Sequence, residues 1–170
     1  MLYSELQCSE AIHKAVERMG FAEMTEIQEK TIPVMLAGHD VIAKAPTGTG
    51  KTCAFGIPVA EHIDPEKKYP QAVIMAPTRE LAQQIAEELT ELTYFMPEVQ
   101  VACVYGGANM EKQARRLAEG CQIVVATPGR LMDHYKHHSI DLAHVTQVVL
   151  DEADEMLNMG FYKDVRHIIE

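Results

Sequence analysis

Short runs of apolar and β-branched residues alternate along the chain with longer segments in which apolar residues recur every three or four positions. This alternation is typical of an α/β fold with a mainly parallel sheet and helices on both faces. The pattern predicts strands over Asp40 to Ala43, Ala72 to Ala76, Val99 to Tyr105, Gln122 to Ala126 and Thr146 to Leu150. It predicts helices over Ser9 to Met19, Thr25 to Leu36, Lys51 to His62, Arg79 to Tyr94, Met110 to Glu119, Gly129 to Lys136 and Tyr162 to the end.

Residues at the ends of the first two predicted helices support these boundaries. Ser9 is a suitable N-cap and Gly20 a suitable C-terminal stop. Thr25 and Gln28 have the spacing of a capping box, in which the side chains at N-cap and N3 each accept a hydrogen bond from the other residue's backbone. The helices are therefore specified at their ends as well as by their periodicity.

The predicted strands lead into distinctive polar segments. In chain order these segments are Ala45 to Thr52, Pro77 to Ala82, Gly106-Gly107, Thr127 to Arg130, and Asp151 to Asp154. In open α/β sheets, ligands bind outside the carboxyl ends of the strands. The sequence thus predicts a ligand site at one edge of the sheet.

Two of these segments fit the halves of a nucleoside-triphosphate site. Ala45 to Thr52 follows a predicted strand, precedes a predicted helix and ends in Gly-Lys-Thr, the pattern of a loop whose backbone N–H groups cradle phosphates. In such a loop the lysine reaches the outer phosphates and the threonine hydroxyl binds magnesium. Asp151 and Glu152 would add a carboxylate for the ion and one for the attacking water.

Composition narrows the range of partners. The 170 residues suit one domain, and a net charge of −10 argues against holding nucleic acid by bulk electrostatic attraction. Local phosphate contacts at helix N-termini remain compatible with that charge.

The four cysteines are far apart in sequence, which predicts reduced thiols and neither a metal knuckle nor a disulfide framework. With no secretory signal and no membrane-spanning run, a cytoplasmic location is expected.

The segments APTGTGKT, PTRELA, GG, TPGR and DEAD occur in an order and spacing that resemble the amino-terminal RecA-like domain of a DEAD-box ATP-dependent RNA helicase. The resemblance covers virtually the whole chain. It implies an adenine-recognition segment over residues 1–36 and a RecA-like phosphate-loop ATP-binding domain over residues 37–170. Two departures occur: Met24 stands where the family usually has proline, and Tyr3 where it usually has phenylalanine.

The resemblance implies ATP and Mg²⁺ as cofactors. Gln28 would hydrogen-bond the adenine edge while Tyr3 stacks on the ring. The capping role of Gln28 could coexist with this contact or compete with it. Lys51 would bind the outer phosphates, Asp151 would hold the ion partly through water, and Glu152 would orient or deprotonate the attacking water. Thr52 and Asp151 would hold the metal, and Asp154 would couple the ATP site to the rest of the protein. The implied ATP-binding residues are Tyr3, Gln28, Ala45, Thr47, Gly48, Thr49, Gly50, Lys51 and Thr52.

The other strand ends would bind RNA. Arg79 and Arg130, each at the start of a predicted helix, suit two successive phosphates. The implied RNA-binding residues are Pro77, Thr78, Arg79, Gly106, Gly107, Thr127, Pro128, Gly129 and Arg130. Such contacts touch the backbone and not the bases, which predicts sequence-independent binding coupled to local duplex unwinding.

The family's serine-alanine-threonine segment and its second RecA-like domain do not occur in the chain. The sheet is therefore expected to be truncated before its last core strand. Because the second domain supplies transition-state arginines, the chain alone is expected to bind nucleotide weakly and to be nearly inactive as an ATPase.

Other functions also fit parts of the sequence. A phosphate-loop kinase or DNA translocase would share the nucleotide site, and an RNA- or protein-binding fragment could keep the fold without hydrolysis. His134, His137 and His138 share one side of a predicted helix and could hold a metal, although a solvated face is the favoured interpretation.

Overall fold

The computed structural model describes residues 2, 5, 8–21, 23–38, 51–107 and 109–152. They fall into two compact units, one made of Met1–Ile63 with Glu88–Pro97 and the other of Asp64–Glu87 with Glu98–Glu170.

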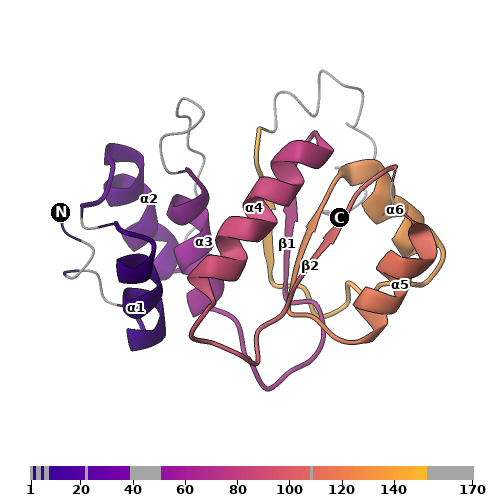
Figure 1. The fold of residues 1–170 in the computed structure, drawn as a ribbon, viewed down its shortest axis with the longest axis horizontal. Helices are drawn as coiled ribbons and strands as arrows, with labels where there is room; N and C mark the ends of the chain where they lie inside the picture. The colour runs from indigo at the N-terminus through magenta and orange to yellow at the C-terminus, as the bar shows by residue number, and fades with distance from the viewer. Residues whose placement is uncertain are drawn as a thin grey trace. The chain divides into compact units, whose positions relative to one another are not determined.

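The first unit is helical and contains α1 (Glu10–Arg18), α2 (Glu26–Leu36), α3 (Lys51–Glu61) and the end of α4 (Arg79–Leu92) (Figure 1). Its core includes the fully buried side chains of Ile12, Ile32 and Ile57. A Cβ atom at Gly56 would lie 2.8 Å from Leu92 Cδ1, so the glycine lets α3 and the end of α4 approach closely.

Both predicted helix starts in this unit are confirmed. The Ser9 side chain accepts from the Ile12 N–H, and Gly20 has φ +84° just beyond the end of α1. At α2 the Thr25 N–H donates to Gln28 Oε1 at 3.0 Å, and the Gln28 N–H donates to Thr25 Oγ1 at 3.4 Å. Both halves of the capping box are thus formed.

The second unit is built on a parallel sheet. Its strands are β1 (Ala72–Met75), β2 (Val101–Val104), β3 (Ile123–Ala126) and β4 (Gln147–Leu150), in the order β2-β3-β1-β4. Every neighbouring pair is parallel. Helices α5 (Met110–Ala118) and α6 (Pro128–Lys136) connect successive strands. Parallel strands require such crossovers, which explains the alternation seen in the sequence.

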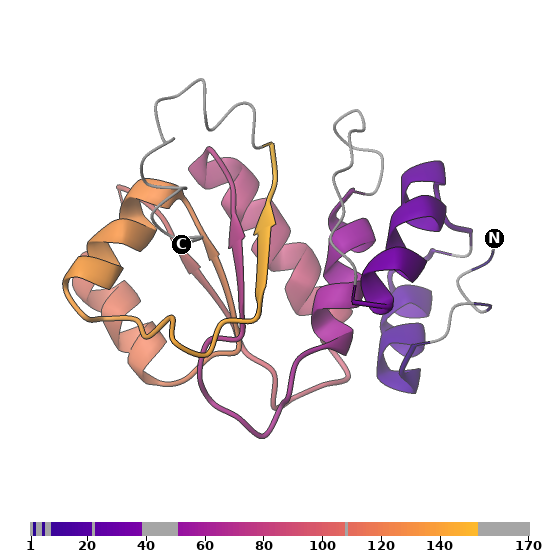
Figure 2. The ribbon, with the colours of Figure 1, turned by 180° about the vertical axis from the view of Figure 1, so that it is seen from behind.

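Both faces of this sheet are covered. On one face the buried side chains of β1, β2 and β3 pack in one cluster with Leu117 of α5 and Leu131 of α6. Strand residues on the other face of the sheet, such as Ile74 and Ile123, are also fully buried. Both ribbon views show α5 and α6 together on one side of the strands (Figures 1 and 2).

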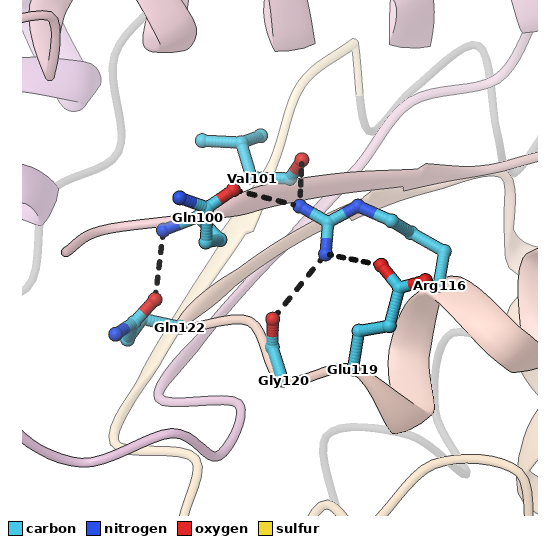
Figure 3. Close-up of polar contacts among 6 residues, drawn as sticks. All are labelled: Gln100, Val101, Arg116, Glu119, Gly120 and Gln122. Carbon is cyan, nitrogen blue, oxygen red and sulfur yellow. Dashed lines mark hydrogen bonds and ion pairs between the residues drawn. The ribbon is translucent and has the colours of Figure 1, made fainter. Parts of the chain in front are cut away.

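Arg116 of α5 lies against the outer edge of β2 (Figure 3). Its Nη2 donates to the carbonyl of Val101 and to Gln100 Oε1, each at 3.3 Å, and its Nη1 donates to the Gly120 carbonyl at 3.3 Å. A charged side chain bonded to an edge carbonyl blocks pairing with another strand and also anchors the end of the helix.

The predicted elements agree with the structure to within about two residues wherever it describes them. The largest differences, of two residues each, are at the start of β2, which begins at Val101 where Val99 was predicted, and at the end of α4, which ends at Leu92 where Tyr94 was predicted. The predicted strand over Asp40 to Ala43 and the predicted helix from Tyr162 onward lie outside the described residues.

Candidate functional site

The carboxyl ends of the four strands meet at one edge of the sheet, because all neighbouring pairs are parallel. This edge brings together residues 77–79 after β1, 105–107 after β2, 127–130 after β3 and 151–152 after β4. The described residues of four of the predicted segments therefore lie at the position that the sequence predicts.

Helix α4 begins at this edge. The Thr78 hydroxyl accepts from the Leu81 N–H at 3.3 Å, which caps the helix, and Arg79 is its first residue. The exposed Arg79 guanidinium carbon lies 5.1 Å from the centroid of the Tyr105 ring. A Cβ atom at Gly107, where φ is +86°, would lie 3.7 Å from Arg79 Nη1. Arg79 and the glycine pair are thus neighbours in space.

Helix α6 also begins here. Thr127 is its N-cap but makes no side-chain capping bond, and Pro128 occupies the first turn, where its missing N–H carries no penalty. The Thr127 N–H donates to the Val104 carbonyl at 3.1 Å, which ties this turn to the end of β2. The positive end of the helix dipole at such a turn favours an anion.

Arg130, in the first turn of α6, is held within the unit. Its Nη1 donates to Gln113 Oε1 at 3.1 Å and its Nε lies 3.8 Å from Asp133 Oδ2. Only 14% of its side chain is exposed. The two arginines that the sequence predicts to bind successive phosphates therefore differ in solvent exposure, since Arg79 lies on the surface and Arg130 is largely buried.

The end of β4 carries the two acidic residues. Asp151 is 8% exposed and its N–H donates to the Met75 carbonyl at 2.9 Å, so the backbone continues the sheet to this point. Glu152 is half-buried and has φ +51°, a left-handed conformation that is uncommon for a residue other than glycine. Strained backbone of this kind concentrates at functional sites.

Less of the nucleotide segment is described. Lys51 begins α3 and Thr52 is half-buried, but the Lys51 side chain, Tyr3, residues 45–50 and Asp154 lie outside the described residues. Gln28 is 3% exposed and caps α2. An antiparallel bridge pairs Leu2 with Glu23, which places the residue before Tyr3 close to the start of α2.

The prediction of a solvated histidine face is wrong for His134, which is fully buried, whereas His137 and His138 are exposed. His134 Nε2 lies 3.1 Å from Gln113 Oε1, so packing against α5 draws this side chain inward. Among the described residues no group of three or more His, Cys, Asp or Glu side chains could hold a metal.

Tyr105 and Gln113 are residues of this site that the sequence did not single out, and His134 was considered only as part of a histidine face. Tyr105 directly precedes Gly106-Gly107, which is a usable signal. Gln113 and His134 look like surface positions of amphipathic helices in the sequence, and only their burial distinguishes them.

Curated relatives and solved structures agree on one class of protein. The chain is 52% identical over 170 residues to the ATP-dependent RNA helicase CshA of Limosilactobacillus reuteri, covering 100% of this chain and 34% of the relative. It is 46% identical over 167 residues to the ATP-dependent RNA helicase DeaD of Escherichia coli strain K12, covering 98% of this chain and 27% of the relative. The chain therefore spans about a third of the length of the relatives it matches.

The fold matches as well. A crystal structure of a DEAD box protein from the hyperthermophile Methanococcus jannaschii superimposes with a TM-score of 0.91 at 41% identity, covering 99% of this chain and 46% of that one. A hypothetical ATP-dependent RNA helicase from Sulfolobus tokodaii gives a TM-score of 0.84 at 42% identity, over 94% of this chain and 46% of that one. No described helix has the length and apolar character needed to span a membrane.

The family model described as DEAD/DEAH box helicase matches residues 25–170. This range contains the phosphate-loop segment and the strand ends whose geometry is given above. With its parallel RecA-like sheet, the chain belongs to the DEAD/DEAH box helicase family.

Proposed function

We propose that this chain is the ATP-binding domain of an ATP-dependent RNA helicase, which couples ATP binding and hydrolysis to sequence-independent RNA binding and local duplex unwinding. The observation that carries the proposal is the carboxyl edge of the sheet, where two helix N-termini, two arginines, a glycine pair and an acidic pair meet. Its relatives are named ATP-dependent RNA helicases, which supports the same activity.

RNA would bind along the starts of α4 and α6. The exposed Arg79 guanidinium, the amides of the first turn of α6 and the Thr127 hydroxyl are donors of the kind that phosphate oxygens accept. Arg130 would add its positive charge from a largely enclosed position. Pro77, Thr78, Gly106, Gly107, Pro128 and Gly129 complete the proposed surface.

ATP would bind through the phosphate loop at residues 45–52, with Lys51 on the outer phosphates. Magnesium fits Asp151 chemically, since a largely buried carboxylate is a hard oxygen ligand, and Thr52 offers a hydroxyl of the same kind. When bound, the ion would neutralise phosphate charge. Glu152, next to Asp151, would orient the attacking water or accept its proton.

Gln28 would read the adenine edge while keeping its capping role. The Thr25 N–H donates to its amide oxygen at 3.0 Å, which holds the side chain at the start of α2. Holding the amide in this way fixes its orientation before the base arrives. Tyr3 would stack on the adenine ring, with its backbone neighbour held by the Leu2–Glu23 bridge.

RNA binding tests the proposal. Fluorescence anisotropy with labelled single-stranded RNA should show binding by the unmodified chain and its loss in an Arg79→Ala, Arg130→Ala double variant. Arg115→Ala, an exposed arginine near the end of α5, is the matched control and should bind normally. The proposal is abandoned if the double variant binds as tightly as the control.

Nucleotide binding separates the helicase from other phosphate-loop proteins. The chain should prefer ATP to GTP, and Gln28→Ala should remove that preference. Glu152→Gln should leave RNA binding intact, as expected for a residue that acts on the attacking water. Equal binding of ATP and GTP by the unmodified chain would instead favour a phosphate-loop kinase or translocase.

A further inference from the structure

We infer that Tyr105 and Gln113 form a bridge that fixes the guanidinium groups of Arg79 and Arg130 relative to each other, so that the two arginines bind phosphate as one unit. The bridge is a property of the second unit alone, and its use for RNA phosphates rests on the proposed function. All four residues belong to the part of the chain around the carboxyl edge of the sheet.

Tyr105 holds the start of α4 at two points. Its ring lies under the Arg79 guanidinium, with 5.1 Å from the guanidinium carbon to the ring centroid. Its hydroxyl accepts from Gln83 Nε2 at 3.0 Å. Because Gln83 lies one turn beyond Arg79 on the same helix face, one aromatic side chain fixes both the helix and the arginine that starts it.

Gln113 holds the start of α6 in a matching way. Its side chain is 7% exposed, and its Oε1 accepts from Arg130 Nη1 at 3.1 Å. His134, one turn beyond Arg130, lies with Nε2 3.1 Å from the same oxygen. His134 Nδ1 has no hydrogen-bond partner among the described residues, which favours the neutral tautomer that donates from Nε2.

The two halves join at Tyr105. Gln113 Nε2 donates to the Tyr105 backbone carbonyl at 3.0 Å. With its oxygen facing two donors and its NH₂ group facing a carbonyl, the Gln113 amide has one satisfactory orientation. A continuous path of contacts therefore runs from Arg79 through Tyr105 and Gln113 to Arg130.

The physical consequence is preorganisation. An arginine side chain that is free in solution loses rotamer entropy when it binds a phosphate, whereas one held by a ring or an amide has already lost part of it. Tyr105 and Gln113 are thus positioning residues. They should change phosphate affinity through the two arginines and have no effect when the arginines are removed.

The first test is a double-mutant cycle with single-stranded RNA, measured by anisotropy on the 170-residue chain. Tyr105→Leu removes the ring and hydroxyl but keeps apolar bulk, and should weaken binding about three- to tenfold. In an Arg79→Ala background the same change should have almost no effect, since the residue it positions is gone. Equal losses in both backgrounds would overturn the inference.

Gln113→Glu tests the second half of the bridge. Glutamate keeps an acceptor for Arg130 but cannot donate to the Tyr105 carbonyl. The affinity for single-stranded RNA should therefore fall, and this loss should vanish in an Arg130→Ala background. Lys112→Glu, on an exposed neighbouring position of α5, makes a larger change of charge and is the control for nonspecific charge effects.

An RNA-independent measurement distinguishes failure of the bridge from failure of the proposed function. In NMR spectra of the side-chain Nε–Hε groups, the Tyr105 ring should shift the Arg79 signal, Tyr105→Phe should retain that shift, and Tyr105→Leu should abolish it. An Arg79 signal that is the same in all three proteins overturns the inference. If the shift is present but the unmodified chain does not bind RNA, the proposed function fails and the shared binding of phosphate fails with it.

Discussion

His134 has an environment that its position on a helix does not suggest. It is fully buried, with Nε2 on Gln113 and Nδ1 without a partner among the described residues. Burial lowers its pKa below the ordinary value of 6.5, and the nearby Arg130 charge lowers that pKa further, while Asp133 acts in the opposite direction. The imidazole therefore stays neutral in the folded protein under conditions where it is protonated in the unfolded chain.

We expect His134 to make stability fall as the solution becomes acidic. Its folded pKa lies below its unfolded pKa, so its contribution is fully present above about pH 6.5 and is lost as the pH falls below that value. The free energy of unfolding should therefore be lower at pH 5.5 than at pH 7.5. Urea unfolding at pH 7.5 and pH 5.5 measures it.

His134→Leu should flatten the dependence between those two pH values. Identical pH profiles for His134→Leu and the unmodified chain would contradict the assignment.

The thiols of Cys103 and Cys121 are also perturbed by their surroundings. Burial raises the pKa of each to about 11, although the Arg116 charge acts in the opposite direction on Cys121. Because the thiolate is the reactive form, alkylation by iodoacetamide at pH 8 should be slow in the folded chain and fast in urea. The alkylation rate of the folded chain should rise toward pH 11. Because the thiol pKa is higher in the folded chain than in the unfolded chain, the free energy of unfolding should fall between pH 9 and pH 11. Fast labelling of both cysteines in the native chain at pH 8 would show that burial does not protect them.

At the scale of elements, α5 is fixed to the sheet by Arg116. The side chain is about one-third exposed. It donates to the Val101 carbonyl of β2 and to the carbonyl of Gly120, which lies just beyond the end of α5, and it lies 4.0 Å from Glu119 (Figure 3). Gly120, with φ +102°, makes that end possible, since a side chain there would be strained.

Replacing Arg116 by alanine should lower the free energy of unfolding by about 1 kcal/mol, because three hydrogen bonds to a partly exposed charged group are lost. Arg115→Ala, which removes an exposed charge from the preceding position, should change it by less than about 0.5 kcal/mol. Chemical denaturation of both variants makes the comparison. Equal destabilisation by the two changes would mean that the contacts on β2 contribute nothing.

At the scale of the whole molecule, the phosphate loop and the acidic pair belong to different compact units. The chain also spans about a third of the length of its relatives. In comparable enzymes an arginine supplied from outside the nucleotide-binding domain contributes about 10³ to 10⁵ in rate.

We expect the 170-residue chain to bind adenine nucleotide weakly and to show negligible RNA-stimulated hydrolysis. Phosphate release with and without RNA measures this, with Lys51→Ala as the control for contaminating ATPases. A clear rate in the unmodified chain that Lys51→Ala abolishes would contradict the expectation.

Local sequence signals predicted the elements well because the signals are themselves local. The capping box at Thr25 and the strand ends before Pro77 and Thr127 depend on residues a few positions apart. The histidine face was misassigned for the opposite reason. Whether His134 points to solvent depends on Gln113, 21 residues away, and periodicity carries no information about that contact.

The sequence by itself determined that the chain forms a parallel α/β sheet whose strand ends carry the phosphate-type segments, since periodicity dictates the elements and parallel pairing aligns their carboxyl ends. Only the tertiary structure decided how the arginines at that edge are held. Tyr105 follows β2, Gln113 lies in α5 and His134 lies in α6, and their hydrogen bonds exist because packing buries polar groups that must then satisfy one another.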